Sequence, residues 1–228
     1  KIILNERNDI TVQYFKNTFL KKFYFFLLRK KKVKLVTNSL NTYKTFKSAK
    51  TNCELIYIYN KIDDIIEKNY DNYKLKPNLI KLSCVGRFTY QKGQIELIKI
   101  ISSIKNKDYI LNFYGRGLLK KQIEENVLRF RLVNKINLKS SNNLNDIYKD
   151  TDVVLINSVY EGQSNVLLEC LEHGKPMLIN KRLKDELIEI YGHEVVDFIY
   201  FFNTSEDINF YLEEIKNNSE YLKKILTK

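Results

Sequence analysis

Two glutamates that stand eight positions apart, Glu161 and Glu169, are the residues best placed to do chemistry in this sequence. The apolar, β-branched run at 153–156 before them is typical of a buried strand. The run at 166–171 has the length and residue types of a helix, and Gly174 ends it. One carboxylate therefore lies on a loop and the other just inside a helix, both at the carboxyl end of a strand. In open α/β sheets, this edge is where ligands bind.

The residues between the two glutamates indicate which ligand would fit. The backbone N–H groups of Ser164, Asn165 and Val166 would lie at a helix N-terminus, which is a favourable site for an anion. Two carboxylates that accept hydroxyl hydrogen bonds around such a site suit a ligand with sugar hydroxyls at both ends and phosphate between them. A nucleotide sugar has this shape.

A cationic pair upstream is consistent with phosphate binding. Arg87 follows a predicted strand and Gly86, where the chain turns tightly. Lys92 lies at the start of a predicted helix, where its charge is unfavourable unless an anion offsets it. A guanidinium binds phosphate through two parallel hydrogen bonds, and an ammonium adds a point charge. The alternative interpretation is a solvated surface pair.

Strand-like and helical segments alternate after residue 33. This alternation predicts an α/β fold with a Rossmann-like, doubly wound parallel sheet. Ser205 is a plausible N-cap of the last helix. The predicted strands are 34–37, 54–58, 79–85, 109–114, 135–138, 152–156, 176–179 and 195–200, and the predicted helices are 92–104, 117–129, 143–149 and 205–226.

Four motifs resemble the retaining glycosyltransferases with the GT-B fold, specifically glycosyltransferase family 4 (group 1). The spacing from Glu161 to Glu169 is similar to the E-x7-E motif of that family. Residues 85–93 resemble its VGR…KG segment, 114–117 its G-x-G turn, and 58–63 its I-x-N-G-x-D linker. The order and spacing of all four agree with the family over roughly residues 55–215.

The resemblance implies a role for each matching residue. Arg87 and Lys92 would hold the donor diphosphate and stabilise the leaving nucleoside diphosphate, so no metal and no other cofactor is expected. Glu161 would bind hydroxyls of the transferred sugar and Glu169 those of the ribose. Glu161, Arg87 and Lys92 are thus the predicted catalytic residues. The predicted donor-binding residues are Gly86, Arg87, Lys92, Gly115, Gly117, Gln163, Ser164, Asn165, Val166 and Glu169.

Several of these residues also have a plainer interpretation. Glu161 could simply complement a helix dipole, and the two glycines at 115 and 117 could form an ordinary turn. His173 and His193 invite an acid–base role. However, His173 is predicted to be a helix C-terminal residue and His193 a loop residue. The segment 139–141 aligns with the loop that contacts the base in the family, but its residues differ from the family's usual sequence there.

The resemblance implies the donor-binding C-terminal part of a retaining glycosyltransferase. It would transfer a sugar from a nucleotide diphosphate sugar, most simply a UDP-sugar, to a hydroxyl of a glycan or lipid-linked oligosaccharide. Two alternatives are a GT-B-type UDP-sugar epimerase and a non-catalytic nucleotide-sugar-binding module that needs a partner chain. Residues 1–50 are interpreted as a remnant of the N-terminal acceptor domain and linker, 51–204 as the donor domain, and 205–228 as a helix that crosses back. The missing N-terminal half could be on another chain.

Composition limits the partners. The net charge of +12 suggests nucleic acid, but lysine is abundant throughout, which is more typical of compositional bias. No run of apolar residues is long enough to span a bilayer. Three scattered cysteines indicate a reduced, cytoplasmic setting. The aromatic and lysine-rich segment 8–29 is either a helix packed on a domain or an interfacial helix, which would give peripheral association with the inner face of a membrane.

Overall fold

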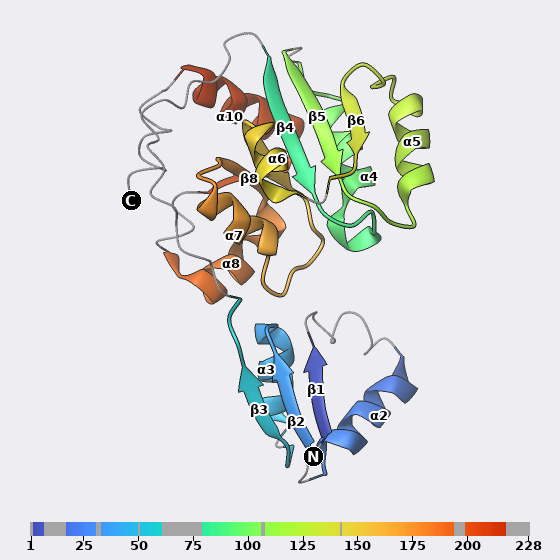
Figure 1. Cartoon of the computed structure of the whole chain (residues 1–228), viewed down its shortest axis with the longest axis vertical. Helices are drawn as coiled ribbons and strands as arrows, with labels where there is room; N and C mark the ends of the chain where they lie inside the picture. Colours follow the sequence, from blue (N-terminus) through green and yellow to red (C-terminus); the bar gives the residue numbers. More distant parts are fainter. Residues whose placement is uncertain are drawn as a thin grey trace. The chain divides into compact units, whose positions relative to one another are not determined.

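The chain folds into two units in a computed structural model that describes residues 2–6, 17–30, 33–49, 51–60, 79–105, 108–141, 143–193 and 199–217 (Figure 1). Unit 1 comprises Lys1–Lys61 and Tyr160–Asn165, and unit 2 comprises Ile62–Val159 and Val166–Lys228. Each unit is built on a parallel sheet with helices between its strands. The predicted α/β fold class is therefore confirmed.

The sheet of unit 2 has the strand order β6-β5-β4-β7-β8-β9, and every neighbouring pair is parallel. From the centre of the sheet, β4, β5 and β6 follow one another towards one edge, and β7, β8 and β9 follow one another towards the other. In doubly wound sheets, ligands bind outside the carboxyl ends of the strands at this reversal. The strands are β4 (Ile80–Val85), β5 (Tyr109–Tyr114), β6 (Ile136–Lys139), β7 (Val153–Ile156), β8 (Met177–Asn180) and β9 (Tyr200–Phe202).

Helices cover both faces of this sheet because its central strands are apolar on both sides. Val153 and Leu155 point into the core with α4 (Gln94–Ile101), α5 (Lys120–Arg129) and α10 (Ser205–Asn217). The alternate residues, Val154 and Ile156, point into the core with α6, α7 and α8. These helices are α6 (Leu144–Lys149), α7 (Asn165–Glu172) and α8 (Lys184–Tyr191).

Unit 1 holds a smaller parallel sheet with the order β1-β2-β3. Its strands are β1 (Ile2–Glu6), β2 (Val33–Thr37) and β3 (Glu54–Tyr57), and its helices are α2 (Thr18–Leu28) and α3 (Leu40–Ser48). Strand β3 pairs with β2, so residues 54–57 belong to the sheet of unit 1, although the sequence analysis assigned everything from residue 51 to the donor domain. The core is formed by Leu28, Val33, Leu35, Phe46 and Cys53.

Several predicted helix starts need correction. Helix α5 begins at Lys120 rather than at Gly117. Gly93 has φ +66° after a short 3-10 turn, η2 (Tyr90–Lys92), so α4 begins at Gln94 rather than Lys92. Thr204, not Ser205, caps α10, because its Oγ1 accepts a hydrogen bond from the Asp207 backbone N–H at 3.3 Å. The Asp207 carboxylate accepts in turn from the N–H of Thr204 at 3.1 Å, which completes a capping box. Residues 194–198 and 218–228, where predicted elements also fall, lie outside the described residues.

The three cysteines are buried, as expected for small core residues. None of the helices in the described segments is long and apolar enough to cross a membrane.

Asp150, the residue directly after α6, interacts with side chains from three strands. Its carboxylate forms an ion pair with Lys81 of β4 and a second one with Lys139 of β6, at 3.0 Å. The Tyr114 hydroxyl of β5 donates to the same carboxylate at 3.1 Å. Burial opposes ionisation, but the hydrogen bonds from Lys81 and Lys139 outweigh it and lower the pKa of Asp150 to about 2.

We expect Asp150→Asn to lower the free energy of unfolding at neutral pH by about 1 kcal/mol, since the partly exposed carboxylate is screened by solvent. A carboxylate whose pKa falls on folding stabilises the protein above its ordinary value of 3.8. This contribution disappears as the pH falls from there to about 2. Urea unfolding across this range should therefore show the two proteins converging. Asp146→Asn, on the exposed side of α6, is the control. A difference that stays constant with pH would contradict the assignment.

Candidate functional site

The loop that follows β4 carries the predicted cationic pair. Gly86 has φ +149°, a conformation that favours glycine, and its N–H donates to the carbonyl of Tyr114 at 2.9 Å. A Cβ at this position would lie 3.2 Å from Cδ and Cε of Lys92. Gly86 therefore makes room for the lysine stem to cross the loop. Arg87 is exposed. Lys92 is the last residue of the 3-10 turn ahead of α4 and does not lie in the first turn of that helix.

The loop that follows β5 packs directly on this first loop. A Cβ on Gly115 would overlap the carbonyl oxygen of Gly86 and lie 2.9 Å from its carbonyl carbon. A Cβ on Gly117 would lie 2.8 Å from the backbone nitrogen of Phe88. The N–H of Phe88 donates to the carbonyl of Arg116 at 2.8 Å. The close approach of two backbones thus explains both glycines without a ligand.

The loop that follows β7 joins the same block through Asn157, which the sequence analysis missed. Its side-chain amide donates to the carbonyl of Gly93 at 2.8 Å, and a Cβ on Gly93 would lie 2.9 Å from that amide nitrogen. The side chain of Asn180, at the end of β8, donates to the Asn157 side-chain oxygen at 2.8 Å. An asparagine directly after each of two predicted strands, 152–156 and 176–179, was the signal available in the sequence.

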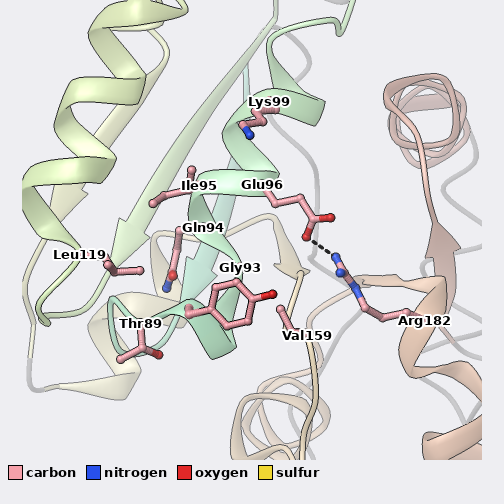
Figure 2. A pocket seen from close by; sticks show the side chains of 10 residues that line it. Thr89, Gly93, Gln94, Ile95, Glu96, Lys99, Leu119, Val159 and Arg182 are labelled. Atoms are coloured by element: carbon pink, nitrogen blue, oxygen red, sulfur yellow. Dashed lines mark hydrogen bonds and ion pairs between the residues drawn. The ribbon is translucent and has the colours of Figure 1, made fainter.

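Two hollows at this block are lined by residues that the structure describes. One, of about 330 Å³, is walled by α4 and crossed by an ion pair between Glu96 and Arg182 (Figure 2). Besides that pair, it is lined by Thr89, Tyr90, Gly93, Gln94, Ile95, Lys99, Leu119 and Val159.

The other hollow, also about 330 Å³, contains two of the predicted site residues. Of the described residues that line it, three are basic and none is Asp or Glu, and Lys139 is the one of the three that pairs with Asp150. This lining favours an anionic or electron-rich ligand. The residues are Phe88, Gly115, Arg116, Gly117, Lys120, Leu138, Lys139 and Ser140. Among the described residues, no cluster of three or more His, Cys, Asp or Glu side chains could hold a metal ion.

Glu169 is held by a buried tyrosine that the sequence analysis also missed. The Tyr148 hydroxyl, on α6, donates to Oε2 of Glu169 at 2.6 Å. Burial, followed by the neighbouring Cys170 and Glu169, raises the pKa of this hydroxyl, which keeps it a hydrogen-bond donor. The ring of His173 stacks on Tyr148 at 4.6 Å, and its Nδ1 lies 2.9 Å from the Glu169 carbonyl. His173 is thus a residue of the helix C-terminus, as predicted.

The remaining predicted residues belong to the part of unit 1 formed by Tyr160–Asn165. Glu161, Gln163 and Ser164 are buried there. The Gln163 amide donates to the Tyr57 hydroxyl at 2.9 Å, and its oxygen accepts from the Asn60 backbone N–H. The Asn60 side chain also donates to Asn165 Oδ1 at 2.6 Å. Gln163 and Asn165 therefore fasten this loop to the end of β3.

The predicted site is thus divided between the two units. Unit 2 contains Gly86, Arg87, Lys92, Gly115, Gly117, Val166 and Glu169, whereas unit 1 contains Glu161, Gln163, Ser164 and Asn165. Within unit 2, the structure brings Gly86 against Lys92 and against Gly115. Glu169 instead contacts α6, through Tyr148.

The doubly wound parallel sheet of unit 2 defines a Rossmann-like α/β domain. The sequence profile of the family "Glycosyl transferases group 1" matches residues 65–227. The chain therefore belongs to the group 1 glycosyltransferase family.

Curated relatives agree with this assignment. An uncharacterised glycosyltransferase of Methanocaldococcus jannaschii is 33% identical over 115 residues, which make up 49% of this chain and 29% of the relative. The amylovoran biosynthesis glycosyltransferase AmsD of Erwinia amylovora is 25% identical over 120 residues, 52% of this chain and 32% of that protein. The match thus spans about a third of the length of these relatives.

Solved structures share the fold. Anabaena HepE in complex with UDP-glucose has a TM-score of 0.75 at 18% identity, covering 98% of this chain and 65% of HepE. A mutant of Staphylococcus aureus TarM, in complex with fondaparinux, α-GlcNAc-glycerol and UDP, has a TM-score of 0.66 at 17% identity, covering 94% of this chain and 43% of TarM. These similarities confirm the GT-B type of fold.

We expect Gly115→Ala to lower the free energy of unfolding by about 2–3 kcal/mol, because the added methyl group overlaps backbone atoms that cannot move aside. Urea unfolding measures the loss. A free energy of unfolding that Gly115→Ala leaves unchanged would show that the two loops can separate at little cost.

Proposed function

We propose that the chain is the donor-binding part of a retaining glycosyltransferase that uses a UDP-sugar. One observation carries the proposal: the Gly86–Lys92 loop and the basic hollow at Gly115–Lys139 share the carboxyl edge of a sheet whose strand order reverses there. Family membership supports it, as do the UDP and UDP-glucose complexes of HepE, whose fold is similar.

The proposed roles are those that the family resemblance implies. Arg87 and Lys92 bind the diphosphate, and Glu169 accepts hydrogen bonds from the ribose hydroxyls. The base enters the hollow beside Gly115 and Gly117. The sugar's hydroxyls are bound by Glu161, together with backbone N–H groups at Ser164, Asn165 and Val166. No metal is needed in this scheme because the two cations supply the positive charge.

The chemistry of transfer explains why cations are needed. The bond from the anomeric carbon to the β-phosphate oxygen breaks, and its electron pair leaves with UDP. The acceptor hydroxyl forms the new glycosidic bond with retention at the anomeric carbon, and its proton is lost. Charge therefore accumulates on the departing diphosphate, where Arg87 and Lys92 stabilise it.

We propose that the acceptor is a hydroxyl of a glycan or lipid-linked oligosaccharide, in the cytoplasm at the inner face of a membrane. In this proposal, a second polypeptide supplies the residues that bind the acceptor. The similarity of fold also leaves two alternatives that binding and turnover experiments would separate. A UDP-sugar epimerase would interconvert the donor, whereas a non-catalytic module would bind the nucleotide and leave it unchanged.

We expect isothermal titration with UDP, GDP and ADP to show selective binding of UDP, without metal and equally with magnesium. Glu169→Ala and Lys92→Ala should each weaken UDP binding about tenfold or more, as expected for losing one charge-assisted contact. Lys121→Ala, on the exposed face of α5, is the charge-matched control. Unchanged affinity in a folded Glu169→Ala/Lys92→Ala double variant would refute the site.

Tyr148 provides a finer test, since it orients Glu169 without reaching the ligand itself. We expect Tyr148→Phe to weaken UDP binding about threefold to tenfold through loss of one hydrogen bond. The affinity for 2′,3′-dideoxy-UDP should not change, because that nucleotide has no ribose hydroxyls for Glu169 to bind. An equal loss for both nucleotides would mean that Tyr148 only supports the fold.

A further inference from the structure

The hollow crossed by the Glu96–Arg182 ion pair, which we call the α4 hollow, is separate from the proposed donor site. All its lining residues belong to unit 2, and none of them is a residue proposed to bind the donor. It also shares no lining residue with the basic hollow. Its volume of about 330 Å³ lies within the range of pockets that hold small ligands. The α4 hollow is therefore a pocket of suitable size without an assigned ligand.

Two buried polar atoms belong to side chains that line the α4 hollow and have no partner among the described residues. Gln94 is only 1% exposed. Its amide nitrogen donates to the carbonyl of Arg87 at 3.0 Å, whereas its Oε1 accepts no hydrogen bond. The Oγ1 of Thr89 is likewise buried and unpaired. A buried polar atom without a partner costs about 1–3 kcal/mol. Both atoms thus favour a ligand that brings hydroxyl groups.

The ion pair in the α4 hollow is held in place by a third side chain. Glu96 and Arg182 approach each other from α4 and from the segment after β8 (Figure 2). The Oδ1 of Asn157 accepts from the Arg182 guanidinium at 3.1 Å, and its amide donates to Oε2 of Glu96 at 3.2 Å. The Glu96 and Arg182 side chains are still 48% and 30% exposed. A carboxylate fixed beside a guanidinium can accept from one ligand hydroxyl and donate to the next.

We propose that the α4 hollow is a second saccharide-binding site, which takes a neutral sugar unit. The ring of Tyr90, which lines the hollow and is 75% exposed, offers an apolar surface to the C–H face of a pyranose. The buried oxygens of Thr89 and Gln94 would pair with hydroxyls on one side of the sugar. Glu96 and Arg182 would pair with hydroxyls on another.

Charge favours a neutral sugar over a phosphate or an acidic sugar. The charged residues of the α4 hollow are Glu96, Lys99 and Arg182, and the two ions of opposite sign are already paired. The basic hollow, by contrast, has three cations and no carboxylate in its lining. An anion in the α4 hollow would meet the Glu96 carboxylate, which repels it.

Polarity also argues against a wholly apolar ligand. Such a ligand would leave Gln94 Oε1 without a donor and would remove the exposed Glu96–Arg182 pair from water, and both changes are unfavourable. A pyranose combines an apolar face with a rim of hydroxyls, as the mixed lining requires.

A sugar unit bound in the α4 hollow would not be the one that reacts. Residues 89, 90 and 93 line the hollow, and Lys92, which is proposed to bind the donor diphosphate, lies within the same short segment. A glycan bound here would raise the local concentration of its other units near that segment. This consequence rests on the proposed function, whereas saccharide binding itself does not.

The test is an NMR titration, by saturation-transfer difference, of the purified chain with the methyl glycosides of glucose, galactose, mannose and N-acetylglucosamine. We expect at least one glycoside to bind, and excess UDP to leave it bound because the donor residues lie outside the hollow. Tyr90→Ala and Gln94→Leu should each weaken this binding about threefold to tenfold, through loss of the ring surface and of one hydrogen bond.

Matched controls make the same changes elsewhere. Gln122→Leu, on the exposed face of α5, and Tyr59→Ala, in unit 1, should bind the glycoside like the wild type. Circular dichroism would show that each variant is folded. Should the buried Gln94→Leu variant fail to fold, the exposed Tyr90 position still decides the question.

Three outcomes would overturn the proposal: none of the four glycosides binds, Tyr90→Ala leaves the binding unchanged, or UDP displaces the glycoside, which would assign it to the donor site. UDP titration of the same samples tests the proposed function separately. Glycoside binding without UDP binding would refute the donor assignment and leave the saccharide site standing.

Discussion

The contact between backbone atoms of the loops after β4, β5 and β7 is the constraint on which the site of unit 2 depends. Three of the residues that make it are glycines, Gly93, Gly115 and Gly117, and each faces atoms of another loop with no room for a side chain. These contacts join the strand ends into one block. Within this block, Gly86 faces the stem of Lys92, and Gly115 and Gly117 line the basic hollow. The backbone contacts therefore help to set the positions of these charged side chains.

Much of unit 2 could be predicted because its signals are local. Apolar runs such as 109–114 and 153–156 coincide closely with β5 and β7. The errors occur where tertiary contacts determine where a helix begins or which strand is a partner. Helix α4 begins later than the apolar periodicity of residues 92–104 indicates, because Gly93 precedes it with a positive φ. Thr204, rather than Ser205, caps α10, because Thr204 and Asp207 exchange two hydrogen bonds. In unit 1, β1 and α3 were not predicted, and the partner of β3 depends on the packing of the sheet rather than on its own residues.

In the candidate site, too, residues with local sequence signals were predicted and residues that act through distant contacts were not. Sequence spacing identifies Glu169, Arg87 and Lys92, because charged residues near strand ends are visible in the chain itself. It does not identify Tyr148, which acts on Glu169 from a helix 21 positions earlier, nor the pairing of Asn157 with Gly93 across the sheet. It also gives Gly115 and Gly117 a ligand-facing role but does not show that each of them packs against the loop after β4. The missed residues share one property: their contacts are distant in sequence.

The short segment Tyr160–Asn165 has a consequence for how this protein can be divided. It is covalently continuous with β7 and α7, yet its hydrogen bonds, through Gln163 and Asn165, go to Tyr57 and Asn60. Unit 1 is therefore discontinuous in the chain. A fragment cut after residue 61 would lack the side chains that engage the end of β3, and the complementary fragment would carry a loop without its anchor. Recombination between family members at this boundary would have to exchange two segments together, so residues near 57–60 and 160–165 are coupled in any exchange of domains.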